Sequence, residues 1–340
     1  MYRSLVALLV ATSLIFCSRS IAVAQGFFQG KTIRLLVGSA PGASYDSYSR
    51  LLAPYLRAQI PGNPDIVVQN MPAAGGTVAA NYVYNVAERD GLTIGMFNRA
   101  AVLSAIVGNP LSKFKPADIF WLGTAASFSD NAYLFVIKGL PYTTVDQMRN
   151  APRPISVGNS GSAPVLILKN VLGLNVKVIE GYSKSELDLA FERGEVDGEG
   201  IAYSNLQARH PEWLSQKFVR PMIQFARRER HPDFEDVPTA RELARTDEER
   251  AIIDLVDAPF LIAYPYGLPP GVPVDRADVL RKAFAAALNE PGYAQQARAQ
   301  KLEYSPKTGE EVQSIISEIS ASSPSVVAKY KQIVGENAGD

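Results

Sequence analysis

The stretch IRLLVGSAPGASYDSY, residues 33–48, decides the fold. An apolar run from Ile33 to Val37 meets a turn at residues 38–44, and apolar residues then recur at helical spacing from Tyr48 to Leu56. This order predicts a strand, an open loop and the start of a helix. Such a junction directs unpaired backbone N–H groups and the positive end of a helix dipole at one point, which favours an anion such as a carboxylate. An ordinary βα turn uses the same residue types, so the other segments must decide between a binding loop and a simple connection.

The N-terminus predicts export. Arg3 precedes an apolar run at residues 5–16, and Ala22-Val23-Ala24 has the small-x-small pattern of a signal-peptide cleavage site. No later stretch is long enough and free enough of charge to span a membrane. Cys17 follows Phe16, where a lipoprotein signal needs a small residue. We therefore expect a signal peptide at residues 1–24, cleaved near Ala24, and a protein located in the periplasm without a lipid anchor.

Composition excludes several classes of protein. The chain has 34 Lys and Arg against 34 Asp and Glu, and loss of Arg3 and Arg19 with the signal peptide leaves 32 basic residues. This near-neutral balance argues against a nucleic-acid partner. Removal of Cys17 leaves no cysteine, and both histidines, His210 and His231, precede proline. We therefore expect no metal, no cofactor and no acid–base centre.

The N-terminal third alternates strands and helices. Two further strands are predicted after the first unit. The strand at residues 66–68 is followed by a small-residue loop, residues 70–76, and the strand at residues 93–97 is followed by Asn98-Arg99. Strand, helix, strand, helix, strand in this order implies a parallel sheet with helices on both faces. Ligands of such sheets bind beyond the carboxyl ends of the strands, where these loops lie.

A second set of units begins at an apolar strand, residues 133–137. The strand at 155–157 leads into a Gly/Ser loop, residues 158–164, which is a second candidate for holding an anion. We expect a further strand at 221–226 and a strand at 260–264 that returns to the first domain, followed by C-terminal amphipathic helices. The predicted organisation is lobe 1 at 25–128, lobe 2 at 129–257, and the return to lobe 1 with the C-terminal helices at 258–340.

Seven short motifs together resemble one family. They are APGASYD (40–46), NMPAAGG (70–76), DGLTIG (90–95), GNSGS (158–162), GEVDG (194–198), DVPTARE (236–242) and LPPGVP (268–273). In this collinear order they resemble the tripartite tricarboxylate transporter receptors, also called Bug proteins. The resemblance implies a two-lobed periplasmic-binding-protein fold of the Venus-flytrap, type II-like kind, each lobe a mainly parallel α/β sheet flanked by helices. It also implies a monomeric receptor that captures a small carboxylate-bearing metabolite between two lobes and delivers it to a membrane permease of the same transporter type.

The same resemblance implies which residues hold the ligand. In the family, the first strand-to-helix loop and the Gly/Ser loop of the second lobe surround a carboxylate with backbone amides and hydroxyls. The corresponding residues are Ser39, Pro41, Gly42, Ala43 and Ser44 in the first lobe, and Asn159, Ser160, Gly161, Ser162, Tyr182 and Asp197 in the second. Ala43 stands where the family usually has a glycine, and its Cβ is expected to restrict the backbone angles of the loop.

Arg99 and Tyr45 are judged from their chemistry alone, and Asp197, named above, has two possible roles. Arg99 follows the carboxyl end of a strand, where a guanidinium can pair with a ligand carboxylate, although a solvated loop arginine fits equally well. Tyr45 either covers an apolar part of the ligand or packs as a surface aromatic. Asp197 either receives a ligand hydroxyl or amine or braces its loop.

Two alternatives to a transport receptor remain. Ser160 can be read as the nucleophile of an exported serine hydrolase, but the Gly-x-Ser-x-Gly pattern is not met because position 162 is Ser, and neither histidine offers a convincing base. We therefore expect no enzyme activity. A receptor that signals to a membrane sensor would use the same pocket, so the sequence does not separate it from a receptor that feeds a permease.

Overall fold

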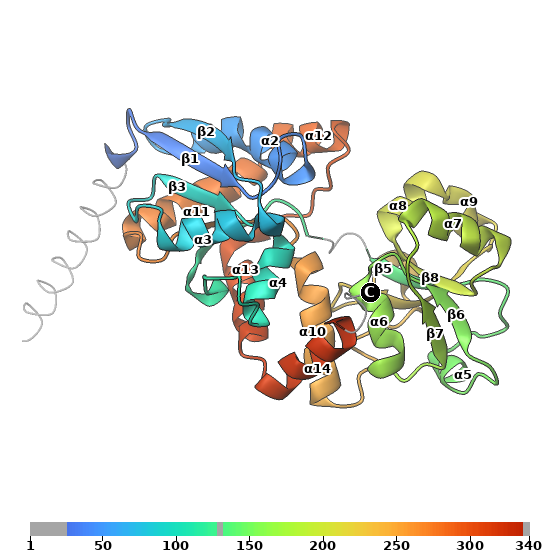
Figure 1. The fold of residues 1–340 in the computed structure, drawn as a ribbon. Helices are drawn as coiled ribbons and strands as arrows, with labels where there is room; N and C mark the ends of the chain where they lie inside the picture. Colours follow the sequence, from blue (N-terminus) through green and yellow to red (C-terminus); the bar gives the residue numbers. More distant parts are fainter. Residues whose placement is uncertain (1–25, 128–131, 336–340) are drawn as a thin grey trace, which may run out of the picture. The chain divides into compact units, whose positions relative to one another are not determined.

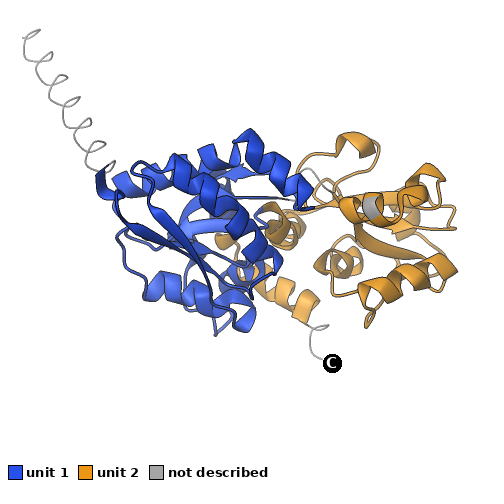
Figure 2. Cartoon of the chain, turned by 90° about the horizontal axis from the view of Figure 1, so that it is seen from above, with its two compact units in different colours: residues 1–127, 262–317 blue, residues 128–261, 318–340 orange. Residues whose placement is uncertain are grey.

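The computed structural model describes residues 26–127 and 132–335, which belong to two compact units. Unit 1 contains the residues up to Ser127 and residues 262–317, and unit 2 contains residues 128–261 and the chain from Glu318 onward (Figure 2). The chain therefore passes from one unit to the other at 127–128, 261–262 and 317–318. The predicted signal peptide, with Cys17, lies outside the described residues.

Unit 1 is built on a six-stranded sheet in the order β11-β4-β10-β3-β1-β2 (Figure 1). Its strands are β1 (Thr32–Val37), β2 (Asp65–Asn70), β3 (Thr93–Met96), β4 (Phe120–Thr124), β10 (Pro265–Leu268) and β11 (Lys307–Thr308). Its helices are α2 (Ser44–Gln59), α3 (Thr77–Asn85), α4 (Arg99–Ile106), α11 (Val274–Leu288), α12 (Pro291–Ala299) and most of α13 (Gly309–Ser320). β1 pairs in parallel with β2 and β3, whereas β10 runs antiparallel to β3 and β4.

Unit 2 is built on a five-stranded sheet in the order β7-β6-β8-β5-β9. Its strands are β5 (Tyr133–Ile137), β6 (Ile155–Gly158), β7 (Val176–Ile179), β8 (Gly198–Ala202) and β9 (Arg220–Phe225). Its helices are α5 (Val145–Arg149), α6 (Ala163–Asn170), α7 (Lys184–Arg193), α8 (Tyr203–Arg209), α9 (Pro211–Ser215), α10 (Asp247–Leu261) and α14 (Pro324–Gly335). β6 is parallel to β7 and β8, and β5 is antiparallel to β8 and β9.

Helix α2 shows how the opening stretch builds unit 1. Tyr48, Leu51, Leu52 and Leu56 recur at helical spacing and are all buried. They join the β1 residues Ile33, Leu35 and Val37 and the inner faces of α11 and α12 in one apolar core. The burial of these side chains holds α2 against the sheet, and the helix continues past Pro54. Its N-terminus is thereby held at the end of β1.

The structure confirms the two-lobed α/β fold and corrects three details of the prediction. Both sheets are mixed, because antiparallel strands complete the parallel core of each. Three strands, β4, β8 and the two-residue β11, were not predicted. β8 reads GEGIA, and glycine is normally depleted in strands. Residues 260–261 end helix α10 instead of starting a strand, and β10 begins at Pro265. A short apolar run such as FLIAY fits a buried helix end as well as a strand.

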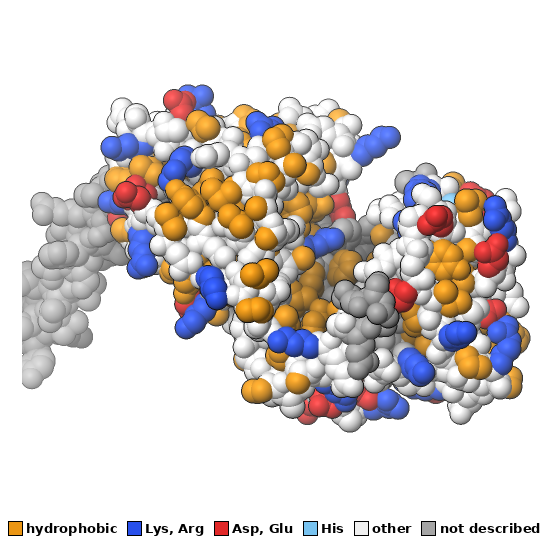
Figure 3. All heavy atoms as spheres, in the orientation of Figure 1, with side chains coloured by type: hydrophobic (Ala, Val, Ile, Leu, Met, Phe, Trp, Pro, Cys, Tyr) orange, Lys and Arg blue, Asp and Glu red, His pale blue; other side chains and the backbone are white. Residues whose placement is uncertain are grey.

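Exposed apolar side chains gather on the face of unit 1 that includes α3 (Figure 3). Val78, in α3, is 43% exposed, and Val86, which ends the helix, is 63% exposed. None of the helices in the part of the chain that the structure describes is long and apolar enough to cross a membrane.

Candidate functional site

The parallel strands of unit 1 end together, and their loops pack tightly there. We call the ends of β1, β2 and β3, with the loops that follow, the carboxyl edge of unit 1. A Cβ placed on Gly76 would lie 2.7 Å from Cβ of Asn98, and one on Gly38 would lie 3.0 Å from Cα of Gly76. Glycine is required because the loops after β1, β2 and β3 approach within backbone contact. The three loops therefore form one continuous surface.

Helix α2 begins at this edge without a side-chain cap among the described residues. Its N-cap residue is Ala43, and the first-turn N–H groups of Ser44, Tyr45 and Asp46 have no partner within the helix. These groups and the helix dipole favour an anion. Ala43 has φ −73° and ψ 163°, an extended conformation open to any residue, so its Cβ does not strain the loop as the sequence suggested.

A buried carboxylate holds the loop before α2 in shape. Asp46 is 2% exposed, and its Oδ2 accepts hydrogen bonds from the Gly42 N–H at 2.8 Å and from Arg50 Nε at 2.9 Å. Asn70, at the end of β2, donates to Asp46 Oδ1 at 2.9 Å and to the carbonyl of Ser39 at 3.0 Å. Burial alone would raise the pKa of Asp46, but these hydrogen bonds and the charge of Arg50 lower it. The Gly42 amide is therefore committed to Asp46 and is not a donor to a ligand, contrary to the expectation for this loop.

The Gly42 position itself faces open space. Gly42 has φ +80°, and a Cβ built on it would contact nothing within 4 Å. Pro41, Gly42 and Ser44 are exposed, while Ser39 and Ala43 are half-buried. The loop is thus rigid on its inner side, through Asp46 and Asn70, and open on its outer side.

Arg99 begins α4 directly beside this loop. Its backbone N–H donates to the Tyr45 hydroxyl at 3.3 Å, and Asn98 caps the helix by accepting from the Ala100 N–H. Burial raises the pKa of Tyr45 and of Tyr264, and the positive charge of Arg99 opposes this effect at both hydroxyls. Its guanidinium therefore lies near the two tyrosines at the start of α2.

Tyr264 is the residue of this edge that the sequence analysis missed. Its ring stacks on Tyr48 with centroids 4.0 Å apart and lies 5.0 Å from that of Tyr45. A hydrogen bond with the Ser44 side chain lowers the pKa of Tyr264 against the effect of its burial. The residue lies 220 positions from Ser44 in sequence, so no local pattern pointed to it.

In unit 2 the loop after β6 is braced in a similar way. Asn159 is 1% exposed; its Oδ1 accepts from the Ser162 N–H at 2.8 Å and its Nδ2 donates to Glu180 Oε1 at 2.9 Å. Asn159 thus shapes the loop from inside and is not itself presented to a ligand. Ser160 is half-buried and Gly161, with φ +82°, is exposed. These two residues form the open part of the loop.

Ser162 is the N-cap residue of α6, and its hydroxyl does not cap the helix. Burial raises the pKa of Tyr133, and the neighbouring Ser162 side chain opposes the rise. The Tyr133 ring covers Gly200, where a Cβ would lie 2.5 Å from the tyrosine hydroxyl. The glycines of β8 therefore make room for an aromatic side chain that lies next to Ser162.

Of the two roles expected for Asp197, its contacts favour the bracing one. It precedes β8 and accepts from the Ser156 N–H at 2.9 Å and from Arg153 Nη1 at 2.9 Å and Nη2 at 3.1 Å. Burial opposes the effect, but these bonds lower the pKa of Asp197. β6 and β8 are parallel, so this position is at their amino ends, opposite to the Gly/Ser loop. Asp197 braces the sheet, and it does not lie with the other predicted ligand residues. Tyr182, in contrast, follows β7 at its carboxyl end and is half-buried against the core under α7.

The structure also brings ionic side chains together near the carboxyl ends of β6 and β7, which we call the carboxyl edge of unit 2. Lys184, the first residue of α7, lies 2.6 Å from Glu199 Oε2 and 2.8 Å from Asp188 Oδ1. Arg209 lies 3.1 Å from Asp188 Oδ2. Lys184, Asp188, Glu199 and Arg209 are named the ionic cluster below.

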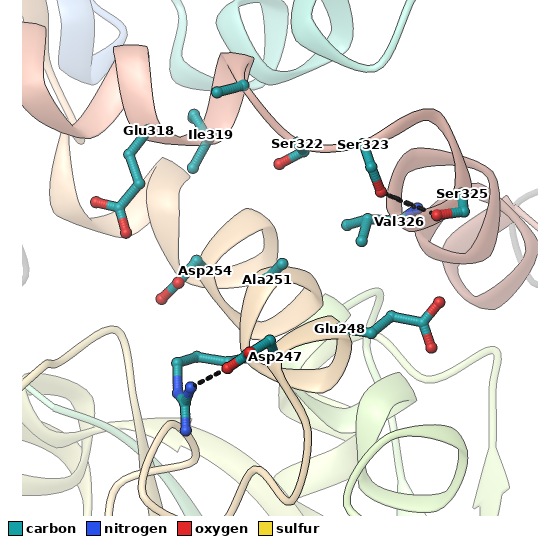
Figure 4. Close-up of a pocket in the computed structure, with 12 residues that line it drawn as sticks. Asp247, Glu248, Ala251, Asp254, Glu318, Ile319, Ser322, Ser323, Ser325 and Val326 are labelled. Atoms are coloured by element: carbon teal, nitrogen blue, oxygen red, sulfur yellow. Dashed lines mark hydrogen bonds and ion pairs between the residues drawn. The ribbon is translucent and has the colours of Figure 1, made fainter.

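Two cavities in the described part of the chain lie away from these loops. One, of about 480 Å³, lies in unit 2 between α10 and the turn from α13 to α14 (Figure 4). Its carboxylates are already paired, as Asp254 is with Arg241, Glu318 with Arg228 and Glu248 with Lys329. An acidic lining repels a carboxylate, so we do not assign the ligand to this cavity. The other, about 430 Å³, is next to Ile137 and Arg220, at the amino end of β6 and β8.

No group of three or more metal-binding side chains occurs within residues 26–127 and 132–335. Each unit has its own set of candidate groups. Unit 1 offers helix N–H groups, hydroxyls and a guanidinium, and unit 2 offers a hydroxyl-bearing loop beside an ionic cluster.

Comparisons with known proteins show the fold. No family model and no curated protein sequence matches the chain. Among solved structures, a ligand-free TctC solute-binding protein from Polaromonas is similar over 90% of this chain and 98% of its own, with a TM-score of 0.67 and 18% identity. The periplasmic binding protein BugD covers 89% and 97%, with a TM-score of 0.50 and 18% identity. MatC from Rhodopseudomonas palustris, with bound malate, covers 89% and 99%, with a TM-score of 0.50 and 20% identity. The chain therefore has the two-lobed fold of the TctC and Bug solute-binding proteins.

Proposed function

We propose that this protein is a periplasmic receptor that binds a small carboxylate and delivers it to a membrane permease of the tripartite tricarboxylate type. The observation that carries the proposal is the uncapped N-terminus of α2 at the carboxyl edge of unit 1, beside Arg99. Backbone N–H groups, a helix dipole and a guanidinium are the groups that proteins use for carboxylates. The fold shared with TctC and Bug proteins supports a role in solute binding, and the permease partner follows from the family resemblance.

In this proposal one carboxylate oxygen accepts from the N–H groups of Ser44 and Tyr45, and Arg99 supplies the countercharge. Asp46 and Asn70 act through the loop, because they hold residues 39–42 in place before the ligand arrives. A loop fixed in advance loses less conformational entropy on binding. Ser160, Gly161 and Ser162 of unit 2 supply further polar contacts to the ligand, with Tyr182 beside them.

A second observation bears on ligand size. The rings of Tyr45 and Tyr264 lie next to the groups that are proposed to bind the carboxylate of the ligand. Aromatic side chains bury large apolar areas, so the site is expected to accept an apolar or ring-bearing body as well as a short diacid.

The test is titration calorimetry of residues 25–340 with malate, citrate and benzoate, on the wild type and on Arg99→Ala. The variant should weaken binding at least about 10-fold, the loss of one charge-assisted hydrogen bond, and should unfold at the wild-type temperature. The control is Arg57→Ala, which removes an arginine that is 53% exposed at the far end of α2. Equal affinity of the wild type and Arg99→Ala would remove Arg99 from the site, and failure of all three acids to bind would contradict a carboxylate receptor.

A further inference from the structure

Glu199 is a buried carboxylate in the middle of the unit 2 sheet. It is 0% exposed, and its register partner on β6 is Gly158, the residue before the loop at 159–162. Its Oε2 meets Lys184 Nζ at 2.6 Å, while its Oε1 has no hydrogen-bond partner among the described residues. A carboxylate in such surroundings is costly unless it is neutralised or fully hydrogen-bonded.

Lys184 connects this buried group with the carboxyl edge of unit 2. It is the first residue of α7, directly after the loop at 180–183 that follows β7, and its side chain is 28% exposed. Its ammonium has three N–H donors, and carboxylate oxygens of Glu199 and Asp188 lie 2.6 and 2.8 Å from Nζ. The ammonium is thus held beside the start of the predicted ligand loop and is still open to solvent in part.

The charge of the ionic cluster depends on one proton. With Glu199 ionised, Lys184 and Arg209 balance Glu199 and Asp188, and the cluster is neutral. With Glu199 protonated, the cluster carries one net positive charge and Lys184 loses one of its two carboxylate partners. Only the second state attracts an anion to Lys184.

The burial of Glu199 favours this second state near neutrality, against the charge of the cations that face it. Burial raises the pKa of Glu199 to about 7, Lys184 and Arg209 oppose the rise, and Asp188 adds to it. Tyr133 on β5 is also within electrostatic range of Glu199. His210, after α8, lies 3.4 Å from Asp188 Oδ2 and stacks on Trp213, so it acts on Glu199 only through Asp188.

We propose, on the basis of the carboxylate-receptor function above, that Lys184 is the anion-binding side chain of unit 2 and that Glu199 takes up a proton when the ligand carboxylate binds there. The incoming carboxylate brings a third negative charge to Lys184, which favours the protonated form of Glu199. Protonated Glu199 in turn releases Lys184 toward the ligand. Proton and carboxylate therefore bind together, and affinity rises as the pH falls.

The test is titration calorimetry with malate, citrate and benzoate at pH 6, 7 and 8, each in two buffers of different ionisation enthalpy. For a group that titrates near pH 7, the wild type should bind about 10-fold more tightly at pH 6 than at pH 8. It should take up about half a proton per ligand at pH 7. Glu199→Gln should keep the tight binding and lose the proton uptake. Any uptake that remains in this variant comes from titration of the ligand itself and can be subtracted from the wild-type value. Lys184→Met should bind about 10-fold more weakly at pH 6 and lose the pH dependence.

The control is Lys177→Met, because Lys177 is an exposed lysine on β7, the strand that precedes α7 in the chain. It should behave as the wild type. If Lys184→Met does not fold, as judged by its circular dichroism, the proton uptake of the wild type and of Glu199→Gln still decides the question. Binding by the wild type with no proton uptake, or with the same uptake in Glu199→Gln, overturns this inference and leaves the proposed function standing. No binding of any of the three acids overturns both.

Discussion

Replacing Asp257 with Asn should stabilise unit 2, and by an amount that depends on pH. Asp257 lies in α10, is 3% exposed, and its carboxyl accepts the backbone N–H of Ala226, which has φ +63°. Burial raises the pKa of this carboxyl to about 8; the Ala226 N–H opposes the rise and Asp254 adds to it. Asn keeps a carbonyl oxygen for the Ala226 N–H and removes the cost of ionising a buried acid.

The size of the effect follows from the two pKa values. Between the ordinary value of 3.8 and the folded value of about 8, the native state binds a proton that the unfolded state has lost. The free energy of unfolding is therefore not reduced by Asp257 below about pH 4, and it falls as the pH rises toward 8. At pH 7 the shift corresponds to at most about 4 kcal/mol of unfolding free energy. The Asn variant should recover this amount at pH 7 and almost none at pH 4.

Urea unfolding at pH 4, 5.5, 7 and 8 measures the difference between the variant and the wild type. Trp213, buried in unit 2, reports this unit by its fluorescence, while Trp121 reports unit 1. The matched control on the same helix is Asp254→Asn, which loses an ion pair to Arg241 at 2.9 Å and should destabilise. A gain from Asp257→Asn that is equal at pH 4 and pH 7, or a loss at pH 7, would refute the account of Asp257.

Two further substitutions separate the binding loop from the sheet. Asp46→Ala should lower the unfolding free energy by roughly 2–4 kcal/mol, since hydrogen bonds to a buried charge are lost. It should also weaken carboxylate binding, because the loop at 39–42 loses the contacts that hold it in place. Unchanged affinity in calorimetry would show that the loop does not need Asp46. Asp197→Ala should lower the unfolding free energy by roughly 1–3 kcal/mol, because Arg153 and the Ser156 N–H lose their acceptor, and should leave the affinity for the carboxylate unchanged. A large loss of affinity in the folded variant would show that Asp197 belongs to the ligand site.

The sequence was sufficient for the features that depend on local pattern. β5 occurs at the predicted residues, β1 and α2 lie within a few residues of their predicted positions, and helices follow β10 toward the C-terminus as predicted. Alternating strands and helices, with apolar residues at regular spacing, determine these elements directly. Two of the strands that were read wrongly or missed have atypical composition: β8 is rich in glycine, and β10 contains proline and glycine. Both are stabilised by pairing with neighbouring strands, which no local pattern reveals.

For the site, the sequence found the loops but not how their residues are used. Asn159 and the Gly42 amide were assigned to the ligand, and both are bonded inside their own loops. Asp197 was assigned by motif, yet its strand direction puts it at the opposite end of the sheet. Tyr264 and Lys184 were missed, because their partners lie far away in sequence or across the sheet. Such contacts depend on tertiary packing, so a single sequence does not show them.

The most direct test of the central claim compares acids with their neutral analogues. Thermal unfolding of residues 25–340 would be recorded with malate and with malamide, and with benzoate and with benzamide. The account predicts that at least one acid stabilises the protein, by roughly 2.7 kcal/mol at a concentration of 100 times its dissociation constant, and that the matching amide has no effect. Equal stabilisation by an acid and its amide, or no shift with malate or benzoate, would contradict a site built for a carboxylate.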